Sequence, residues 1–489
     1  MNHLAYIGTR DNKISATASE AIVNGLCADG GLYIPKEIPK IDKTLEQLAT
    51  LSYQDLAYEV LKLYVDFTED ELRHCINSAY DDKFDTKAIV PLVKKDDALF
   101  LELFHGRTLA FKDMALSILP YLMKTAVKRV GMEKEIVILT ATSGDTGKAA
   151  LEGFADVDGL RIMVFFPEDG VSPVQKLQMT TQEGKNTSVI GILGNFDDAQ
   201  SAVKTIFTDA ALQKELADAG FVFSSANSIN IGRLIPQIVY YFSAYFQAVS
   251  MKEIAMGDKL NVSVPTGNFG DLLAGWYAKS MGLPIGEFIC ASNENKVLFD
   301  FFESKGKYDR NRSFHITVSP SMDILISSNL ERLLSHSLGQ EVTKNAMDSL
   351  GEKGAYAVEM TETHIHGQFA TKEETFASIK TLFDKTNYVM DTHTAVGYAA
   401  YKKYQTATGD MTPTVVVSTA SPYKFTKDVM MALEKAKADD DDFLLMKQLE
   451  TLSGVMIPKT IDHLEQREVL HKTVVAKEEI TNTVRGFLK

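Results

Sequence analysis

Cysteine is scarce in this sequence of 489 residues, which holds only Cys27, Cys75 and Cys290, and no two of these form a CxxC pair. This spacing argues against a disulfide framework and against a thiolate zinc site, so we expect a protein of a reducing compartment. Basic residues are also few, because 51 Lys and Arg against 65 Asp and Glu leave a net charge of −14. A general nucleic-acid binder carries the opposite charge, so we expect no nucleic-acid partner.

Long hydrophobic runs are absent with one exception, the uncharged segment between Arg233 and Lys252. It only just reaches the length of roughly 18 residues that a membrane span needs, and Gln237, Ser243 and Gln247 interrupt it. Its apolar residues recur at helical spacing, so we interpret it as a buried amphipathic helix. The N-terminus, MNHLAYIGTRDNK, has neither the apolar core of a signal peptide nor the composition of a transit peptide. We therefore expect a cytoplasmic protein without a membrane partner.

Glycine and proline are also low, at 31 and 13 residues, as in an ordinary globular protein. From about residue 97, apolar runs of strand length (ALFLEL, EIVILTA, LRIMVFF, TSVIGIL) alternate with helical segments that begin near Lys112, Asp145, Pro173 and Asp197. Continuous apolar strands indicate burial on both faces, and hence mostly parallel sheets covered by helices. The pattern restarts with KLNVSVP, EFICAS and, later, PTVVVST.

This alternation predicts an α/β fold with two lobes, preceded by a mostly helical N-terminal domain in which AYIGTRD is a candidate strand. We expect the N-terminal domain at residues 1–95. The smaller lobe would follow at 96–230, and the larger lobe, with a C-terminal helical segment, at 231–489.

Two segments rich in small residues, TATSGDTGKAAL (140–151) and VPTGNFGDLLAG (264–275), lie where strands pass into helices. Open α/β sheets bind ligands at such points, and backbone N–H groups at a helix start bind anions. The first segment is not a Walker A loop, because Thr142 and Ala149 occupy two of its defining positions, and it lacks GxGxxG. Two anion cradles indicate a ligand with two anionic groups, or a phosphorylated cofactor beside an anionic substrate.

A third segment, LELFHGRTLAFKDMALSILP (101–120), places Lys112 directly before a predicted helix whose first turn holds Asp113. Because a helix start favours anions, we expect this position to lower the pKa of the Lys112 amine. A deprotonated amine is what Schiff-base chemistry requires. Taken alone, the segment favours a surface lysine that has no chemical role.

The segments FHGRTLAFKD, TATSGDTGKAAL, NSINIGR, PTGNFGD and STASPYKF, in this order, make the chain resemble the threonine synthase family over essentially its whole length. The resemblance implies a fold-type II enzyme, similar in fold to tryptophan synthase β, with pyridoxal 5'-phosphate as cofactor. It implies a carbon–oxygen lyase that converts O-phospho-L-homoserine and water into L-threonine and phosphate, the last step of threonine biosynthesis. We expect a monomer or a homodimer.

The resemblance also implies roles for individual residues. Lys112 matches the family's Schiff-base lysine, which also abstracts the Cα proton, and Thr419, beside Ser418, matches the hydroxyl partner of the pyridine nitrogen. The other implied cofactor contacts are Phe111, Gly267, Asn268, Phe269 and Gly270. The implied contacts to the substrate α-carboxylate are Ser143, Gly144, Asp145, Thr146 and Gly147. The implied contacts to its γ-phosphate are Asn227, Ser228, Asn230 and Arg233.

One position departs from the family's pattern, because Arg107 stands where the family usually has the proline of HGPT. An arginine loosens the turn before Lys112 and adds a cation near an anionic substrate. Two other functions remain: a silent sensor of a phosphorylated metabolite, which would have lost Lys112 or the phosphate loop, and a threonine or serine dehydratase.

Three histidines lie outside these motifs. His364 and His366, at positions i and i+2, could bind zinc, but no third ligand is apparent and we expect no metal. We expect His393 at a helix start, where Asp391, Thr392 and Thr394 are the capping candidates.

Overall fold

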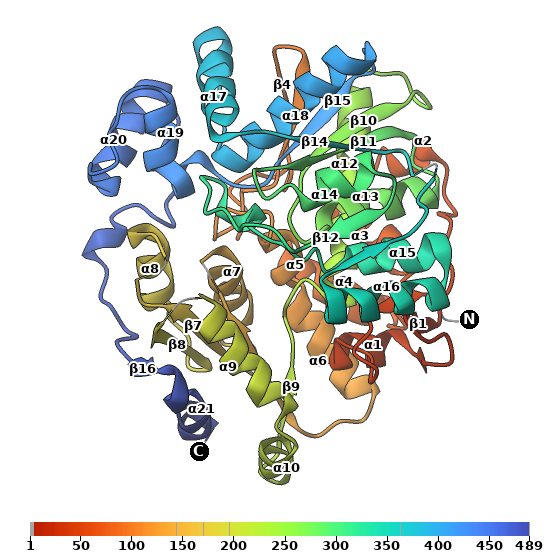
Figure 1. Ribbon diagram of the computed structural model, residues 1–489, viewed down its shortest axis with the longest axis vertical. Coiled ribbons are helices and arrows are strands. Elements are labelled where there is room, and N and C mark those ends of the chain that lie inside the picture. Colours follow the sequence, from red (N-terminus) through yellow and green to blue (C-terminus); the bar gives the residue numbers. More distant parts are fainter. Residues whose placement is uncertain (1–3, 143, 170, 195, 362, 489) are drawn as a thin grey trace.

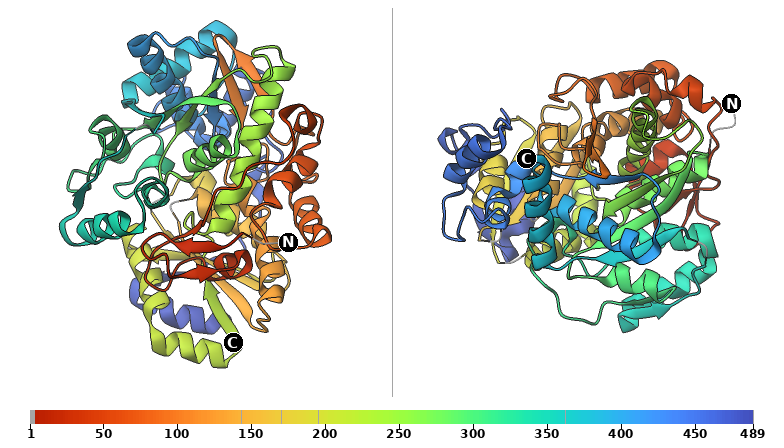
Figure 2. Two further views of the ribbon diagram at one scale, coloured as in Figure 1. Left: turned by 90° about the vertical axis from the view of Figure 1, so that its right-hand side faces the viewer. Right: turned by 90° about the horizontal axis from the view of Figure 1, so that it is seen from above.

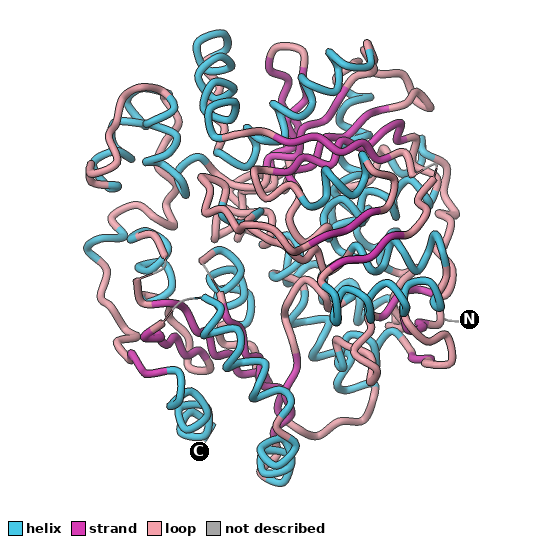
Figure 3. The backbone as a smooth tube through the Cα atoms, viewed as in Figure 1, coloured by secondary structure: helices cyan, strands magenta, loops and turns pink. Residues whose placement is uncertain are grey.

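Two separate β-sheets, surrounded by helices, form the framework of the molecule (Figures 1 and 3). The computed structural model describes residues 4–142, 144–169, 171–194, 196–361 and 363–488. The six-stranded sheet has the order β14-β11-β10-β15-β5-β4 and the five-stranded sheet the order β16-β8-β7-β6-β9. Every pairing in them is parallel except that of β4 with β5. The prediction of two α/β lobes with mostly parallel sheets is confirmed.

The larger lobe is built on the six-stranded sheet and the smaller lobe on the five-stranded sheet. The strands of the larger lobe are β4 Leu92–Lys95, β5 Ala98–Glu102, β10 Leu260–Pro265, β11 Ile285–Ser292, β14 Ile365–Phe369 and β15 Thr414–Ser418. Those of the smaller lobe are β6 Glu135–Ala141, β7 Leu160–Pro167, β8 Thr187–Leu193, β9 Phe221–Ser224 and β16 Val474–Ala476. All six residues of β10 are buried, the polar Asn261 and Ser263 included, as is typical of a parallel strand that is covered on both faces.

The sheets divide the chain at other points than the expected boundaries. Both β4 and β5, on either side of residue 96, belong to the larger lobe, because β5 pairs in parallel with β15. From the C-terminal part of the chain, β16 joins the smaller lobe beside β8. These three strands lie outside the lobes in which the expected bounds place them, because strand partners are chosen by packing between distant segments, which the local apolar pattern does not report.

Helices cover both sheets. In the smaller lobe these are α7 Asp145–Phe154, α8 Pro173–Thr180, α9 Phe196–Thr208, α10 Ala210–Asp218 and α21 Ile480–Leu488. In and around the larger lobe they are α12 Ile238–Ser250, α13 Gly270–Met281, α14 Val297–Glu303, α15 Leu330–Leu338, α16 Gln340–Lys353, α17 Lys372–Thr386, α18 Thr392–Thr408, α19 Thr426–Ala432 and α20 Asp442–Ser453. A small antiparallel pair, β12 Lys307–Asp309 and β13 Ala355–Ala357, lies beside α14 and α16. Short helices α5 Asp113–Leu116 and α11 Ile231–Leu234 and the longer α6 Leu119–Arg129 join the lobes.

The N-terminal region combines a small sheet with four helices (Figure 2, left). Its strands are β1 Tyr6–Gly8, β2 Ser15–Ala16 and β3 Tyr33–Pro35, so the candidate strand in AYIGTRD is confirmed. Its helices are α1 Ala18–Asn24, α2 Leu45–Leu48, α3 Tyr53–Leu61 and α4 Glu69–Ala79. Capping boxes that pair Thr17 with Glu20 and Thr68 with Glu71 start α1 and α4.

The long apolar segment forms α12 after a short 3-10 turn, and nearly all its large side chains are buried. It packs against α3 and α13, so its polar interruptions lie inside the protein: Gln247 donates from Nε2 to the carbonyl oxygen of Val90 at 2.9 Å. Among the residues that the structure describes, no helix has the length and hydropathy to cross a membrane.

Candidate active site

Lys112 lies directly before α5, in a segment whose backbone is joined to the segment after β15. The amide of Phe111 donates to the carbonyl oxygen of Thr419 at 2.8 Å, and that of Ser421 donates to Leu109 at 3.0 Å. The ammonium of Lys424 donates to the carbonyl oxygen of Thr108 at 2.9 Å. Two motifs about 300 residues apart in the sequence, LAFKD and STASPYKF, therefore form one wall of the site.

The amine of Lys112 is buried among charged groups from both lobes. Its Nζ lies 3.7 Å from Oδ2 of Asp145, at the start of α7. Burial lowers the pKa of Lys112, and the positive charges of Lys424 and Arg233 lower it further, while Asp145 opposes them. The predicted direction of the shift is confirmed, but its main causes are burial and neighbouring cations. Because α5 has only four residues, its dipole is a small contribution.

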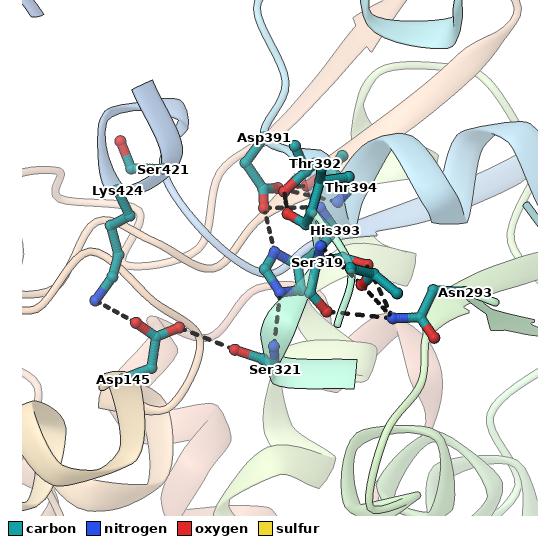
Figure 4. Close-up of polar contacts among 12 residues, drawn as sticks. Asp145, Asn293, Ser319, Ser321, Asp391, Thr392, His393, Thr394, Ser421 and Lys424 are labelled. Atoms are coloured by element: carbon teal, nitrogen blue, oxygen red, sulfur yellow. Dashed lines mark hydrogen bonds and ion pairs between the residues drawn. The ribbon is translucent and has the colours of Figure 1, made fainter. Parts of the chain in front are cut away.

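Asp145 is the point where the two lobes meet in Figure 4. Lys424 Nζ lies 2.8 Å from Oδ1, and Gln175 Nε2 donates to the same oxygen at 3.0 Å. Ser321 Oγ, from the larger lobe, donates to Oδ2 at 3.1 Å. Burial opposes the negative charge of Asp145, but Lys424 and Lys112 outweigh this effect and hold its pKa well below the usual range. The carboxylate is therefore ionised.

Ser321 is in turn held by the start of α18. Its amide donates to Nε2 of His393 at 3.1 Å, so Nδ1 carries the proton and donates to Asp391 at 2.7 Å. Asp391 also caps α18, as predicted, by accepting from the amides of His393 and Thr394. The imidazole thus fixes a serine that touches the other lobe, a role that the capping pattern alone does not reveal.

The GNFG turn has the geometry of a phosphate cradle. Phe269, immediately before α13, has a positive φ of 65°, and a Cβ added to Gly267 would lie 2.8 Å from the carbonyl oxygen of Ser321. The carbonyl oxygen of Asn268 accepts from the amide of Asn329 at 3.0 Å, so the turn is fixed from behind. Backbone N–H groups at the start of a 12-residue helix, with glycine at positions 267 and 270, fit a phosphate group.

The NSINIGR turn lies beside this cradle. Nδ2 of Asn329 donates to the carbonyl oxygens of both Asn268 and Ser228, each at 3.1 Å. Asn230 is fully buried and caps α11, and its amide group donates to Ile22 and Ser225, so its side chain shapes the turn.

Arg233 is the buried cation of this turn. Its Nη1 donates to the carbonyl oxygen of Ala226 at 3.0 Å, and burial lowers its pKa to about 10. Among the described residues its Nε has no hydrogen-bond partner. Lys112, Lys424 and Arg233 are thus three buried basic side chains, and the charges of Lys424 and Arg233 both act on Lys112. Asp145 is the carboxylate that pairs with both lysines. This excess of positive charge and the orphaned guanidinium nitrogen fit an anionic cofactor and an anionic substrate.

The SGDTG loop is described only in part, because Ser143 lies outside the described residues. The hydroxyl of Thr142 accepts from the amides of Gly144 and Gly147 at 3.0 and 2.9 Å, which holds the loop in a tight turn. Gly144 has a φ of 140°, a conformation that favours glycine.

Arg107 does not enter the site. It is half exposed and pairs at 3.0 Å with Glu152 of α7, which also pairs with Lys148. The expectation that Arg107 adds a cation near the substrate is therefore wrong, since its guanidinium forms an ion pair with Glu152 at the lobe boundary. His364 and His366 hold the two oxygens of Glu287, each at 2.9 Å. No group of three or more metal-binding side chains occurs in the described part of the chain.

Sequence patterns did not place four residues in the site: Lys424, Ser321, His393 and Asn329. Lys424 lies within STASPYKF, so a signal was present. The other three lie in segments whose proximity to Lys112 depends on the fold.

Three family models match the chain: "Threonine synthase N terminus" over residues 5–80, "Pyridoxal-phosphate dependent enzyme" over 91–420 and "Threonine synthase, C-terminal" over 394–480. Threonine synthase of Saccharomyces cerevisiae is 35% identical over 498 residues, covering 94% of this chain and 95% of that protein. Human Threonine synthase-like 1 is 39% identical over 87% of this chain, which spans 59% of that longer protein. The PLP-bound threonine synthase from Brucella melitensis has 34% identity and a TM-score of 0.86, with 99% of this chain and 100% of that chain covered.

Proposed function

The chain belongs to the threonine synthase family of pyridoxal-phosphate-dependent enzymes, and we propose that it converts O-phospho-L-homoserine and water into L-threonine and inorganic phosphate. The observation that carries this proposal is the buried group of Lys112, Lys424 and Arg233 together with the two adjoining turns that Asn329 joins. One turn serves the cofactor phosphate and the other the substrate phosphate.

The residues that would hold the cofactor are Lys112, through its amine, the Gly267–Gly270 turn, through its backbone N–H groups, and Phe111 and Thr419, through the wall that they form. When bound, pyridoxal phosphate supplies an electron sink for a carbanion next to the amino group of the substrate. The neutral hydroxyl of Thr419 cannot stabilise a positive charge on the ring nitrogen as a carboxylate would, so proton transfer by Lys112 becomes more important.

Lys112 is the proposed base, because burial and the neighbouring cations lower the pKa of its amine and so make the neutral form easier to reach. It takes the proton from Cα of the substrate, and the loss of a proton from Cβ then allows the γ C–O bond to break, with the electron pair leaving on phosphate. Water adds its oxygen at Cβ, one proton goes to Cγ and one returns to Cα, and the proton that water gives up goes to the departing phosphate. The sum is one water consumed and one phosphate released, with no net oxidation.

Recognition of the substrate is proposed for the two turns that face Lys112. Arg233, Ser228 and Asn227 bind the γ-phosphate, with Asn230 shaping their turn, and the loop from Ser143 to Gly147 holds the α-carboxylate. In this loop the side chain of Asp145 is already bound by Lys424 and Ser321, so the carboxylate of the substrate has to be received by the other groups.

The proposal is tested by incubating the purified chain with O-phospho-L-homoserine and pyridoxal phosphate and measuring phosphate and threonine together. We expect equal amounts of both products. A dehydratase would instead form a 2-oxo acid and ammonia from threonine or serine, and a silent sensor would bind the substrate without releasing phosphate. Either result would reject the proposed reaction. A cytoplasmic location and a monomeric or homodimeric state stay predictions, tested by localisation of a tagged chain and by light scattering.

A further inference from the structure

Lys424 is one of the most deeply buried charged groups in the described part of the chain, with a side chain only 1% exposed. It belongs to a short 3-10 turn, Pro422–Phe425, which follows β15. Its ammonium makes two strong contacts, one to the carbonyl oxygen of Thr108 and one to Asp145. A buried ammonium is retained in a protein when its charge is compensated, and here the compensating group is shared with Lys112.

The carboxylate of Asp145 is shared unequally between the two lysines. Lys424 lies at 2.8 Å, within hydrogen-bond distance, whereas Lys112 lies at 3.7 Å, beyond it. Gln175 and Ser321 donate the remaining hydrogen bonds, one to each carboxylate oxygen. Asp145 is therefore satisfied without a hydrogen bond from Lys112.

We propose that Lys424 is a positioning residue for Lys112: it takes the hydrogen-bonded place on the carboxylate of Asp145 and so weakens the pairing of that carboxylate with the Lys112 amine, which stays at 3.7 Å. The proposal rests on the role of Lys112 in the proposed function. If Lys424 were neutral, Lys112 would be the cation that Asp145 attracts, and its amine would be held charged and directed toward α7. A charged amine can neither attack a carbonyl carbon nor accept a proton.

Other charged groups near Lys112 also influence the pKa of its amine. Arg233 acts in the same direction as Lys424, since it repels a positive charge on Lys112. Asp271, in the first turn of α13, acts in the opposite direction, but the hydroxyls of Tyr240 and Tyr241 donate to its carboxyl at 2.5 and 2.6 Å. His393 reaches Asp145 only through Ser321. Among these groups, Lys424 alone pairs directly with Asp145 in the described structure.

The test measures the charge of Lys112 directly. The full-length chain, freed of cofactor, is treated with trace acetic anhydride over a range of pH, and acetylation of Lys112 is quantified by mass spectrometry. Four variants are compared with the unchanged chain: Lys424→Met, Lys424→Arg, Asp145→Asn and the double variant Lys424→Met with Asp145→Asn. Lys148→Met is the matched control, because Lys148 is also ion-paired on α7, but to Glu152.

We expect Lys424→Met to raise the midpoint of Lys112 acetylation by about one pH unit, which lowers its reactivity about tenfold below that midpoint. Lys424→Arg keeps the charge and leaves the midpoint in place, as does Lys148→Met. Asp145→Asn lowers the midpoint, because Lys424 then repels Lys112 without compensation. The double variant removes one positive and one negative charge together, so its midpoint should return close to that of the unchanged chain.

Three results would overturn the proposal. The first is a midpoint that Lys424→Met leaves unchanged, and the second is a midpoint that Lys424→Arg raises as much as Lys424→Met does. The third is a midpoint in the double variant as high as that in Lys424→Met. If Lys424→Met does not fold, the comparison of Asp145→Asn with the double variant decides, because the second substitution must raise the midpoint again. The labelling requires no turnover, so its outcome stands even if the chain releases no phosphate from O-phospho-L-homoserine. The pH profile of phosphate release by the cofactor-loaded variants provides a second readout, shifted in the same direction.

Discussion

Replacing Arg233 with alanine tests whether the buried guanidinium recognises the substrate phosphate. In the structure Nη1 supports the turn through Ala226, whereas Nε is buried without a partner in the described part of the chain. A charge-assisted hydrogen bond from such a group contributes about 1.5–3 kcal/mol. At about 1.4 kcal/mol per factor of ten, Arg233→Ala is expected to lower kcat/KM for O-phospho-L-homoserine about 10- to 150-fold.

The assay is continuous phosphate release at substrate concentrations below KM, with cofactor retention followed by its visible absorbance. Arg233→Lys is the matched variant, because it keeps the charge and loses the planar fork, and it is expected to recover part of the activity. The control reaction is slow turnover of serine, which has no phosphate and should change little. If Arg233→Ala loses both activities equally, with an altered circular dichroism spectrum, Arg233 is structural. If it loses neither, the phosphate binds elsewhere, and Lys424 is then the first residue to test.

Three further predictions follow from the same structure. Lys112→Ala should leave less than about 1% of the phosphate-releasing activity, because the neighbouring amine of Lys424 is held by Thr108 and Asp145; larger residual turnover would reassign the base. Gly267→Val should release pyridoxal phosphate on dialysis, because even a Cβ at this position lies 2.8 Å from a carbonyl oxygen, and a variant that retains the cofactor would place the cradle elsewhere. His105 lies between Asp85 and Glu102; burial opposes its charge, but both carboxylates outweigh this and raise its pKa to about 9 from an ordinary 6.5. Its stabilisation is thus fully present below pH 6.5 and is lost as the pH rises through 9, so the unchanged chain should lose up to about 3 kcal/mol more than His105→Gln between pH 6.5 and 9.5, as measured by urea unfolding. Equal losses in the two chains would show that His105 is not charged in the folded state.

Local patterns were sufficient for the secondary structure near the site. The run EIVILTA forms β6, and α7 begins at Asp145 as expected, because a strand followed by small polar residues and a helix start is determined by neighbouring residues. The assignment of β5 to the larger lobe could not be obtained in this way, since its partner β15 lies about 300 residues further along the chain. Local pattern reports burial, whereas strand order depends on how distant segments pack.

The chemistry of the site was predictable to a similar extent. The motif around Lys112 indicated an amine with a lowered pKa, and this direction is confirmed. The causes were not predictable, because Lys424 and Arg233 reach Lys112 only through the folded arrangement of three segments. Arg107 shows the converse, as its position in the motif suggested a substrate contact, but its length allows it to pair with Glu152 on the surface.

The pairing of β16 with β8 has a consequence for the order in which the protein forms during synthesis. β8 ends at Leu193 and β16 begins at Val474, so the ribosome adds 281 residues (474 − 193) before the last strand of this sheet exists. At 5–20 residues per second, the edge of β8 stays unpaired for roughly 14–56 s. An unpaired edge strand is a template for pairing with another chain. Nascent chains stalled before Val474 should therefore aggregate or recruit chaperones more readily than chains that have passed it.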